Sequence, residues 1–114
     1  MGKLTTHILD TANGKPAVGV NVRLYRIADE RELCASLMTN DDGRTAEPLL
    51  LGDEFVDGVY ELEFDIGDYF AAGNSNEELP FLGTVVIRVS LKGDQSYHVP
   101  LLATPWSYST YRGS

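Results

Sequence analysis

The sequence YHVPLLATPWSYSTYRGS occupies residues 97–114 and contributes most to the prediction of the fold. It begins as an apolar strand over residues 97–104 and continues to Trp106, Tyr108 and Tyr111. Chain ends fray when nothing holds their backbone, and large aromatic side chains on a loose tail would leave an apolar patch in water. We therefore expect this end of the chain to dock, against its own domain or against another subunit. Trp106 and Tyr108 are then predicted to be packing or interface residues.

Alternating patterns upstream of this stretch predict further strands. Val18, Val20, Val22 and Leu24 occupy every second position, as residues on the buried face of a strand do, and the same holds for Tyr60, Leu62, Phe64 and Ile66. Turns are predicted at Asn13-Gly14 and at residues 40–43. The predicted strands cover residues 4–11, 18–26, 33–39, 60–66, 81–90 and 97–104, with a short edge segment at residues 44–45, and residues 68–72 are predicted as a short helix. Seven or eight short strands with one helix predict an all-β sandwich, in a single domain over residues 1–114.

Composition and charge indicate which classes of binding partner are unsuited to this chain. The formal net charge is −8, and no Lys or Arg occurs between residues 45 and 87. Such a chain is a poor match for nucleic acid or for an anionic membrane surface. The lone cysteine, Cys34, cannot form an intrachain disulfide, which fits a reducing compartment. With no apolar run long enough to span a bilayer and no signal peptide, we expect a soluble, cytoplasmic protein.

Two histidines, His7 and His98, lie near opposite ends of the sequence, and a sandwich can bring its first and last strands together. Two imidazoles and a guanidinium make a plausible hydrolytic set. One imidazole takes a proton from water, and the other donates or orients. Arg44, which emerges from the turn at residues 40–43, supplies a fixed positive charge for a polar substrate. The plainer interpretation is that each histidine is a polar residue on the solvent face of a strand.

Other kinds of chemistry find less support in the residues. Two histidines and Cys34 leave a zinc site short of ligands unless Asp10 or a second subunit contributes. Asp10 itself is predicted to be a structural residue at a strand end. A Gly-x-Ser-x-Gly nucleophile motif and a glycine-rich phosphate loop are both absent from the sequence. We expect neither a metal nor a cofactor.

Four motifs carry a resemblance to a known family. They are LTTHILDTANGKPAVGVNVRLY near the start, TNDDGRT in the middle, and YHVPLL and YSTYRGS at the end. Together they resemble the 5-hydroxyisourate hydrolases, which are related to transthyretin, over essentially the whole chain. The resemblance implies a transthyretin-like sandwich that assembles as a homotetramer, a dimer of dimers with active sites where the dimers meet.

The same resemblance implies the reaction and the site. The reaction is hydrolytic opening of the six-membered ring of 5-hydroxyisourate, giving 2-oxo-4-hydroxy-4-carboxy-5-ureidoimidazoline in urate catabolism. The implied catalytic residues are His7, Arg44, His98 and Ser114, and the implied substrate-binding residues are His7, Arg44, Tyr111 and Ser114. Which histidine acts as the base stays open.

The chain departs from the family pattern in two places, residues 81–84 (FLGT) and 104–107 (TPWS). Both fall outside the four motifs, so we expect them to affect packing or assembly more than chemistry. Two alternatives to the hydrolase remain. One is a transthyretin-like carrier of a small aromatic ligand, without catalysis. The other is a sandwich of the immunoglobulin-like type that serves as an interaction module.

Overall fold

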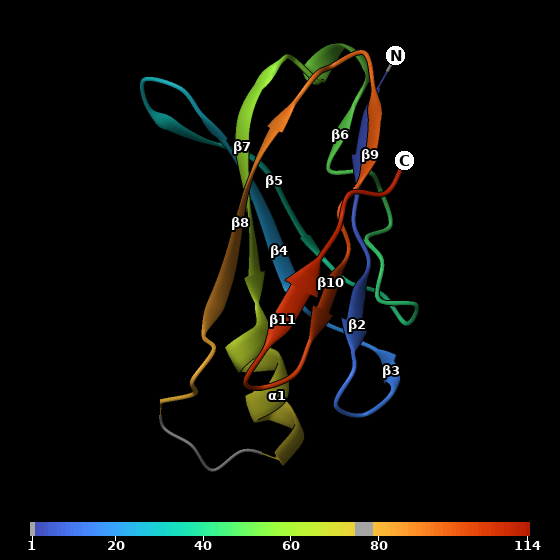
Figure 1. Cartoon of the computed structure of the whole chain (residues 1–114), viewed down its shortest axis with the longest axis vertical. Helices are drawn as coiled ribbons and strands as arrows, with labels where there is room; N and C mark the ends of the chain where they lie inside the picture. Colours follow the sequence, from blue (N-terminus) through green and yellow to red (C-terminus); the bar gives the residue numbers. More distant parts are fainter. Residues whose placement is uncertain (1, 75–78) are drawn as a thin grey trace.

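The computed structural model describes residues 2–74 and 79–114, which form two β layers packed face to face (Figure 1). The strands in these residues are β1 (Lys3–Thr5), β2 (Ile8–Asp10), β3 (Lys15–Pro16), β4 (Asn21–Ile27), β5 (Arg31–Met38), β6 (Leu50–Leu51), β7 (Gly58–Asp65), β8 (Thr84–Leu91), β9 (Ser96–His98), β10 (Leu101–Ala103) and β11 (Tyr108–Thr110). The helices are the 3-10 turn η1 (Gly52–Glu54) and α1 (Ile66–Asn74). The predicted β-sandwich with a short helix is confirmed.

One layer is an antiparallel sheet in the order β5-β4-β7-β8. Strand β7 alternates as predicted, with Tyr60, Leu62 and Phe64 fully buried against the other layer. In β4, Val22 and Leu24 lie on the buried face, as predicted. Val18, which was predicted to lie on the same buried face, does not.

Val18 is exposed because the chain turns before the strand begins. Gly19 has a φ of +79°, a conformation that glycine adopts without steric cost, and it separates Val18 from the buried Val20. The regular strand starts only at Asn21. Hydrophobic alternation alone extended this strand too far.

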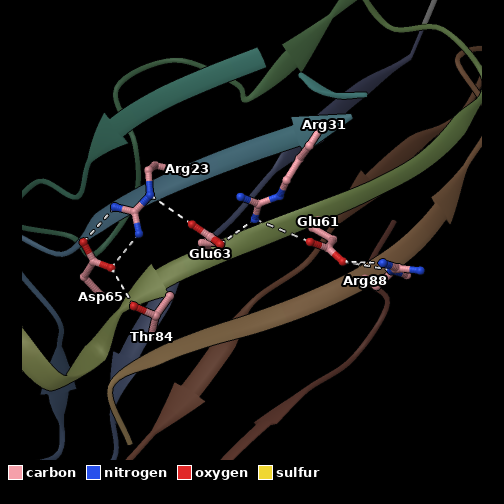
Figure 2. Close-up of polar contacts among 7 residues, drawn as sticks. All are labelled: Arg23, Arg31, Glu61, Glu63, Asp65, Thr84 and Arg88. Carbon is pink, nitrogen blue, oxygen red and sulfur yellow. Dashed lines mark hydrogen bonds and ion pairs between the residues drawn. The ribbon is translucent and has the colours of Figure 1, made fainter. Parts of the chain in front are cut away.

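The outer face of the same sheet carries a ladder of ion pairs, which Figure 2 shows. Arg23 holds both carboxylate oxygens of Asp65 at 2.7 Å and reaches Glu63 at 3.1 Å. The ladder continues through Arg31 and Glu61 to the edge strand β8. Arg31 contacts Glu63 and Glu61, and Arg88 contacts Glu61 at 2.8 Å.

The second layer places the two ends of the chain side by side (Figure 1). Strands β1 and β9 are parallel neighbours, as are β2 and β10. Strand β6 extends this layer beside β1, and β3 and β11 extend it beside β2 and β10. The first and last predicted strands are therefore adjacent, as expected.

Both of these predicted strands are interrupted. The first breaks at Thr6 and His7, between β1 and β2, and the last breaks at Val99 and Pro100, between β9 and β10. Pro100 has no N–H to donate to a ladder, which fits an interruption there. These breaks and the two-residue strands β3 and β6 raise the number of strands in the described residues above the seven or eight expected.

Three other boundaries differ from the prediction. Residues 108–110, expected to be part of an aromatic tail, form the additional strand β11 at the sheet edge. Helix α1 is longer than residues 68–72, and β8 starts at Thr84 rather than at residue 81. The predicted end of the helix at residues 73–74 lies within α1. Strand and helix ends depend on local contacts, so they are less predictable than the elements.

Buried apolar side chains from both layers form the core. They include Leu4, Ile8, Val22, Leu24, Tyr60, Leu62, Phe64, Ile66, Val99 and Leu101. Asp10 is also buried, and it accepts hydrogen bonds from Asn13 and from the Tyr69 hydroxyl of α1. Burial alone would raise the pKa of Asp10, but these hydrogen bonds outweigh it and lower the pKa. Asp10 thus fixes α1 beside β2, the structural role expected of it. Neither helix in the described residues has the length and apolar character needed to cross a membrane.

Candidate active site

The register of the second layer brings the two histidines together on its outer side. Leu4, Thr6 and Ile8 are buried, so the intervening Thr5 and His7 face outward. His98 is the register partner of Thr5 across the β1–β9 pair. The ring centroids of His7 and His98 lie 6.4 Å apart, with the planes tilted by 40°. Residues 91 positions apart in sequence can thus reach one small ligand.

A tight turn at residues 40–43 positions Arg44 beside His7. The Asn40 side chain accepts hydrogen bonds from the backbone N–H groups of Asp42 and Arg44. Gly43 has a φ of +77°, and a Cβ at this position would lie 2.4 Å from the carbonyl oxygen of Ile8, so glycine is required here. Arg44 then forms an antiparallel bridge with His7.

His7 is tied to this turn through its ring. Its Nε2 lies 2.8 Å from the backbone carbonyl oxygen of Asp42. A carbonyl oxygen can only accept, so Nε2 of His7 carries a proton and donates it. The turn therefore positions both Arg44 and the imidazole of His7.

The end of the chain is pinned against His98. The His98 N–H donates to the Gly113 carbonyl at 3.0 Å, and the Gly113 N–H donates back to the His98 carbonyl at 2.7 Å. Upstream, the Thr110 hydroxyl donates to the Pro100 carbonyl at 2.7 Å. The chain end docks on its own domain through these bonds, which is one of the two alternatives expected, and Ser114 follows directly after the residue that contacts His98.

Arg112 points away from the imidazoles and helps to hold the tail. Its guanidinium lies 4.6 Å from the centre of the Tyr97 ring and donates to the side chain of Gln95. Such a cation–π contact at an exposed site contributes about 0.5–1 kcal/mol. The role of Arg112 in these contacts is to anchor the chain end.

Tyr111 lies on a different surface of the chain from the imidazole pair. It is exposed and lines a cavity of about 310 Å³ with Val89, Tyr97 and Val99, at the open edge between the two layers. Within one chain it is therefore His7, His98, Arg44 and the residues around Gly113 that gather. Participation of Tyr111 in a substrate site stays a prediction.

The surroundings of His98 change its pKa. Burial, followed by the positive charge of Arg44 and the nearby His7, lowers the pKa of His98 below its ordinary value. The ring is therefore neutral at physiological pH and free to take up a proton. Among the described residues, no cluster of three or more His, Cys, Asp or Glu side chains has a geometry suited to a metal ion. Cys34 lies on β5, in the opposite layer.

Sequence reasoning missed Thr5, whose Oγ1 lies 2.9 Å from Nδ1 of His98. The available signal was its position two residues before His7, which puts both on one face of a strand. The contact itself depends on the register between β1 and β9, and a single sequence does not give that register.

Known proteins are similar to this chain over almost its whole length. The model of the HIUase/Transthyretin family matches residues 4–113. A 5-hydroxyisourate hydrolase of Pseudomonas aeruginosa is 50% identical over 117 aligned residues, which cover 100% of this chain and 93% of that protein. A 5-hydroxyisourate hydrolase of Deinococcus radiodurans is 52% identical and covers 97% of this chain and 95% of its own.

Solved structures agree with this similarity. The Klebsiella pneumoniae 5-hydroxyisourate hydrolase has a TM-score of 0.83 and 36% identity, with 100% of both chains covered. Sea bream transthyretin in complex with thyroxine has a TM-score of 0.87 and 29% identity, covering 97% of this chain and 94% of its own. An (S)-allantoin synthase has a TM-score of 0.92 and 46% identity over 99% of this chain, which spans 44% of that longer chain. The full-length family match and the identity of these relatives show that the chain belongs to the HIUase/transthyretin family.

Proposed function

We propose that this chain is a hydrolase that opens the six-membered ring of 5-hydroxyisourate. One observation carries the proposal: His7, His98, Arg44 and the docked chain end occupy one side of the sheet, with the imidazole centroids 6.4 Å apart. Relatives at 50% and 52% identity over almost the whole chain carry the name of this activity. The product of the reaction is 2-oxo-4-hydroxy-4-carboxy-5-ureidoimidazoline.

The arrangement supports a mechanism of general-base hydrolysis. One imidazole removes a proton from water as the water oxygen attacks the ring carbonyl carbon. The Arg44 guanidinium holds the carbonyl oxygens of the substrate and stabilises the negative charge that develops on the attacked one. Ser114, the residue after the Gly113 bridge, hydrogen-bonds the substrate, and Tyr111, which lies on a different surface of the chain, shapes the pocket only within an assembly. These roles are part of the proposal.

Stopped-flow absorbance on freshly generated 5-hydroxyisourate tests the activity directly. His7→Ala, His98→Ala and Arg44→Ala should each lower kcat by at least roughly a hundredfold, the usual size of a general-base contribution. Circular dichroism on each variant checks that the sandwich persists. If all three variants keep rates near that of the wild type, the proposal is wrong.

Assembly into a homotetramer, a dimer of dimers, is also part of the proposal. It is supported by the exposed aromatic side chains near the chain end, Trp106, Tyr108 and Tyr111, which soluble monomers rarely leave in water together. In such an assembly Tyr111 would meet a neighbouring subunit. We further propose a cytoplasmic location, on the ground that Cys34 has no partner cysteine in the sequence.

A non-catalytic carrier is the second candidate, because transthyretin crystallised with thyroxine is 29% identical to this chain. Deletion of residues 111–114 distinguishes between a hydrolase and a carrier. A hydrolase should lose turnover while it stays folded, because the tail is bonded to His98. A carrier should keep its affinity for a small aromatic ligand, measured by calorimetry, whether or not the tail is present.

A further inference from the structure

The Thr5 side chain makes a hydrogen bond with the ring of His98. The two are register partners in the parallel β1–β9 pair, and Oγ1 of Thr5 lies 2.9 Å from Nδ1 of His98. Both side chains are half-buried on the outer side of the sheet. The paired backbones hold the hydroxyl in place, so the imidazole meets a fixed partner.

Counting protons gives one assignment in which both neighbours of the hydroxyl are satisfied. A threonine hydroxyl has one proton to donate and lone pairs with which to accept. The Tyr97 carbonyl oxygen lies 3.5 Å from Thr5 Oγ1 and can only accept. When the hydroxyl proton points to Tyr97, Oγ1 accepts from Nδ1–H of His98. Nε2 of His98 is then the nitrogen without a proton.

The ring of His7 is hydrogen-bonded through its other nitrogen, Nε2. Its Nε2 donates to the Asp42 carbonyl, as described above, and this nitrogen is occupied as a donor. Within residues 2–74 and 79–114, Nε2 of His98 has no hydrogen-bond partner, so it is free to meet a water molecule or a substrate. The two imidazoles therefore differ in which nitrogen is bound and in what binds it.

We propose that Thr5 is a positioning residue that holds His98 as the Nδ1–H tautomer, so that Nε2 is the nitrogen that takes the proton of the attacking water. This inference deepens the proposed hydrolase function and rests on it. The water oxygen bonds the ring carbonyl carbon while its proton moves to Nε2. When the C–N bond of the ring breaks, Nε2 returns that proton to the leaving nitrogen. Thr5 accepts from Nδ1–H in the neutral ring and in the imidazolium alike.

Nitrogen-15 NMR of the histidine side chains tests the tautomer without any substrate. Above the His98 pKa, at about pH 8, Nδ1 should show the shift of a protonated nitrogen and Nε2 that of an unprotonated one. Thr5→Val, which keeps the shape and removes the hydroxyl, should give a mixture of tautomers, and Thr5→Ser should restore the wild-type pattern. An unprotonated Nδ1 in the wild-type protein overturns the inference.

Kinetics on the same variants tests the consequence. Thr5→Val should lower kcat about tenfold, as loss of an outer hydrogen-bond partner of a functional histidine does, with KM changed less. Thr5→Ser should recover most of the loss. An unchanged kcat in Thr5→Val contradicts the positioning role, because a hydroxyl with no effect on the base would leave turnover as it was.

Thr6→Val is the matched control. Thr6 is buried and its hydroxyl donates to the Val99 carbonyl at 2.7 Å, so this variant loses a hydrogen bond of the same junction without touching a histidine. It should lower the melting temperature and leave the His98 nitrogen shifts unchanged. A wild-type protein without hydrolase activity contradicts the proposed function. An active wild-type protein with the opposite His98 tautomer contradicts the Thr5 inference alone.

Discussion

At the scale of single residues, the two histidines of the site have different neighbours. A backbone carbonyl fixes the Nε2 proton of His7, whereas a side-chain hydroxyl meets Nδ1 of His98. Burial and the charge of Arg44 keep His98 neutral. A neutral ring with a lowered pKa is suited to accept a proton, and a ring with a bound N–H is suited to orient or donate.

Gly113 gives a prediction at this scale. A Cβ added there would lie 3.0 Å from Cβ of His98 and 3.4 Å from its Cδ2, so Gly113→Ala should displace the imidazole by a few tenths of an ångström. We expect kcat to fall by about tenfold, because small misplacements of reacting groups are costly. The free energy of unfolding should change by less than about 1 kcal/mol.

Stopped-flow assays and thermal melts check both parts of this prediction. Gly83→Ala is the matched control, since a Cβ at Gly83 meets nothing within 4 Å and no positive φ is involved. It should leave kcat unchanged. If Gly113→Ala keeps full activity, close packing of the chain end against His98 does not matter for turnover.

At the scale of elements, regular alternation was the reliable guide. Tyr60, Leu62 and Phe64 were assigned to the buried face correctly, because a half-buried strand shows a period of two. Strand β11 was missed because all three of its residues are exposed, so burial leaves no pattern in its sequence. What holds it is pairing with β10, and that is a tertiary contact.

The same limit applies to the candidate site. The motifs indicated His7, Arg44, His98 and the chain end, and the structure brings these together. Thr5 was not indicated, because its importance depends on standing opposite His98 rather than on its own sequence neighbours. Residue type and periodicity predict faces, whereas cross-strand register decides which side chains touch.

The ion-pair ladder on β4, β7 and β8 gives a prediction for an element (Figure 2). Hydrogen bonds from Arg23 lower the pKa of Asp65, and bonds from Arg31 and Arg23 outweigh burial to lower that of Glu63. Both carboxylates are therefore stabilised as anions in the folded state. Their contribution is complete above the unfolded pKa values of about 4 and is lost as the pH falls through the lower folded values.

Arg23→Met should accordingly destabilise the protein by about 1–2 kcal/mol at neutral pH, since its side chain is only 26% exposed and its contact with Asp65 is bidentate. The difference from wild type should shrink as the pH falls below about 4. Urea unfolding over a pH series measures it. Arg88→Met is the control: its side chain is 64% exposed, and a loss below about 0.5 kcal/mol is expected. Equal losses in both variants, at every pH, would contradict this account.

At the scale of the whole molecule, the parallel pairs β1–β9 and β2–β10 join the two ends of the chain. The site is assembled where the ends meet, from β1, the turn before Arg44, β9 and the final residues. Any change that loosens either end of the chain therefore acts on His98 directly. The exposed aromatic side chains Trp106, Tyr108 and Tyr111 belong to the segment that leads to Gly113, so the proposed assembly would involve the same end of the chain.

Trp106 makes this proposed assembly measurable, because it is the single tryptophan of the chain and is 67% exposed in one subunit. If subunits cover it, its emission should be blue-shifted and weakly quenched by acrylamide, and sedimentation should give four times the 12.5 kDa chain mass. Trp106→Ser should lower that mass and reduce turnover, because interfaces depend strongly on buried aromatic anchors. Leu33→Ser, at an exposed apolar residue of β5 in the other layer, is the control and should change neither. A freely quenched tryptophan in a fully active monomer would show that the site is complete within one chain.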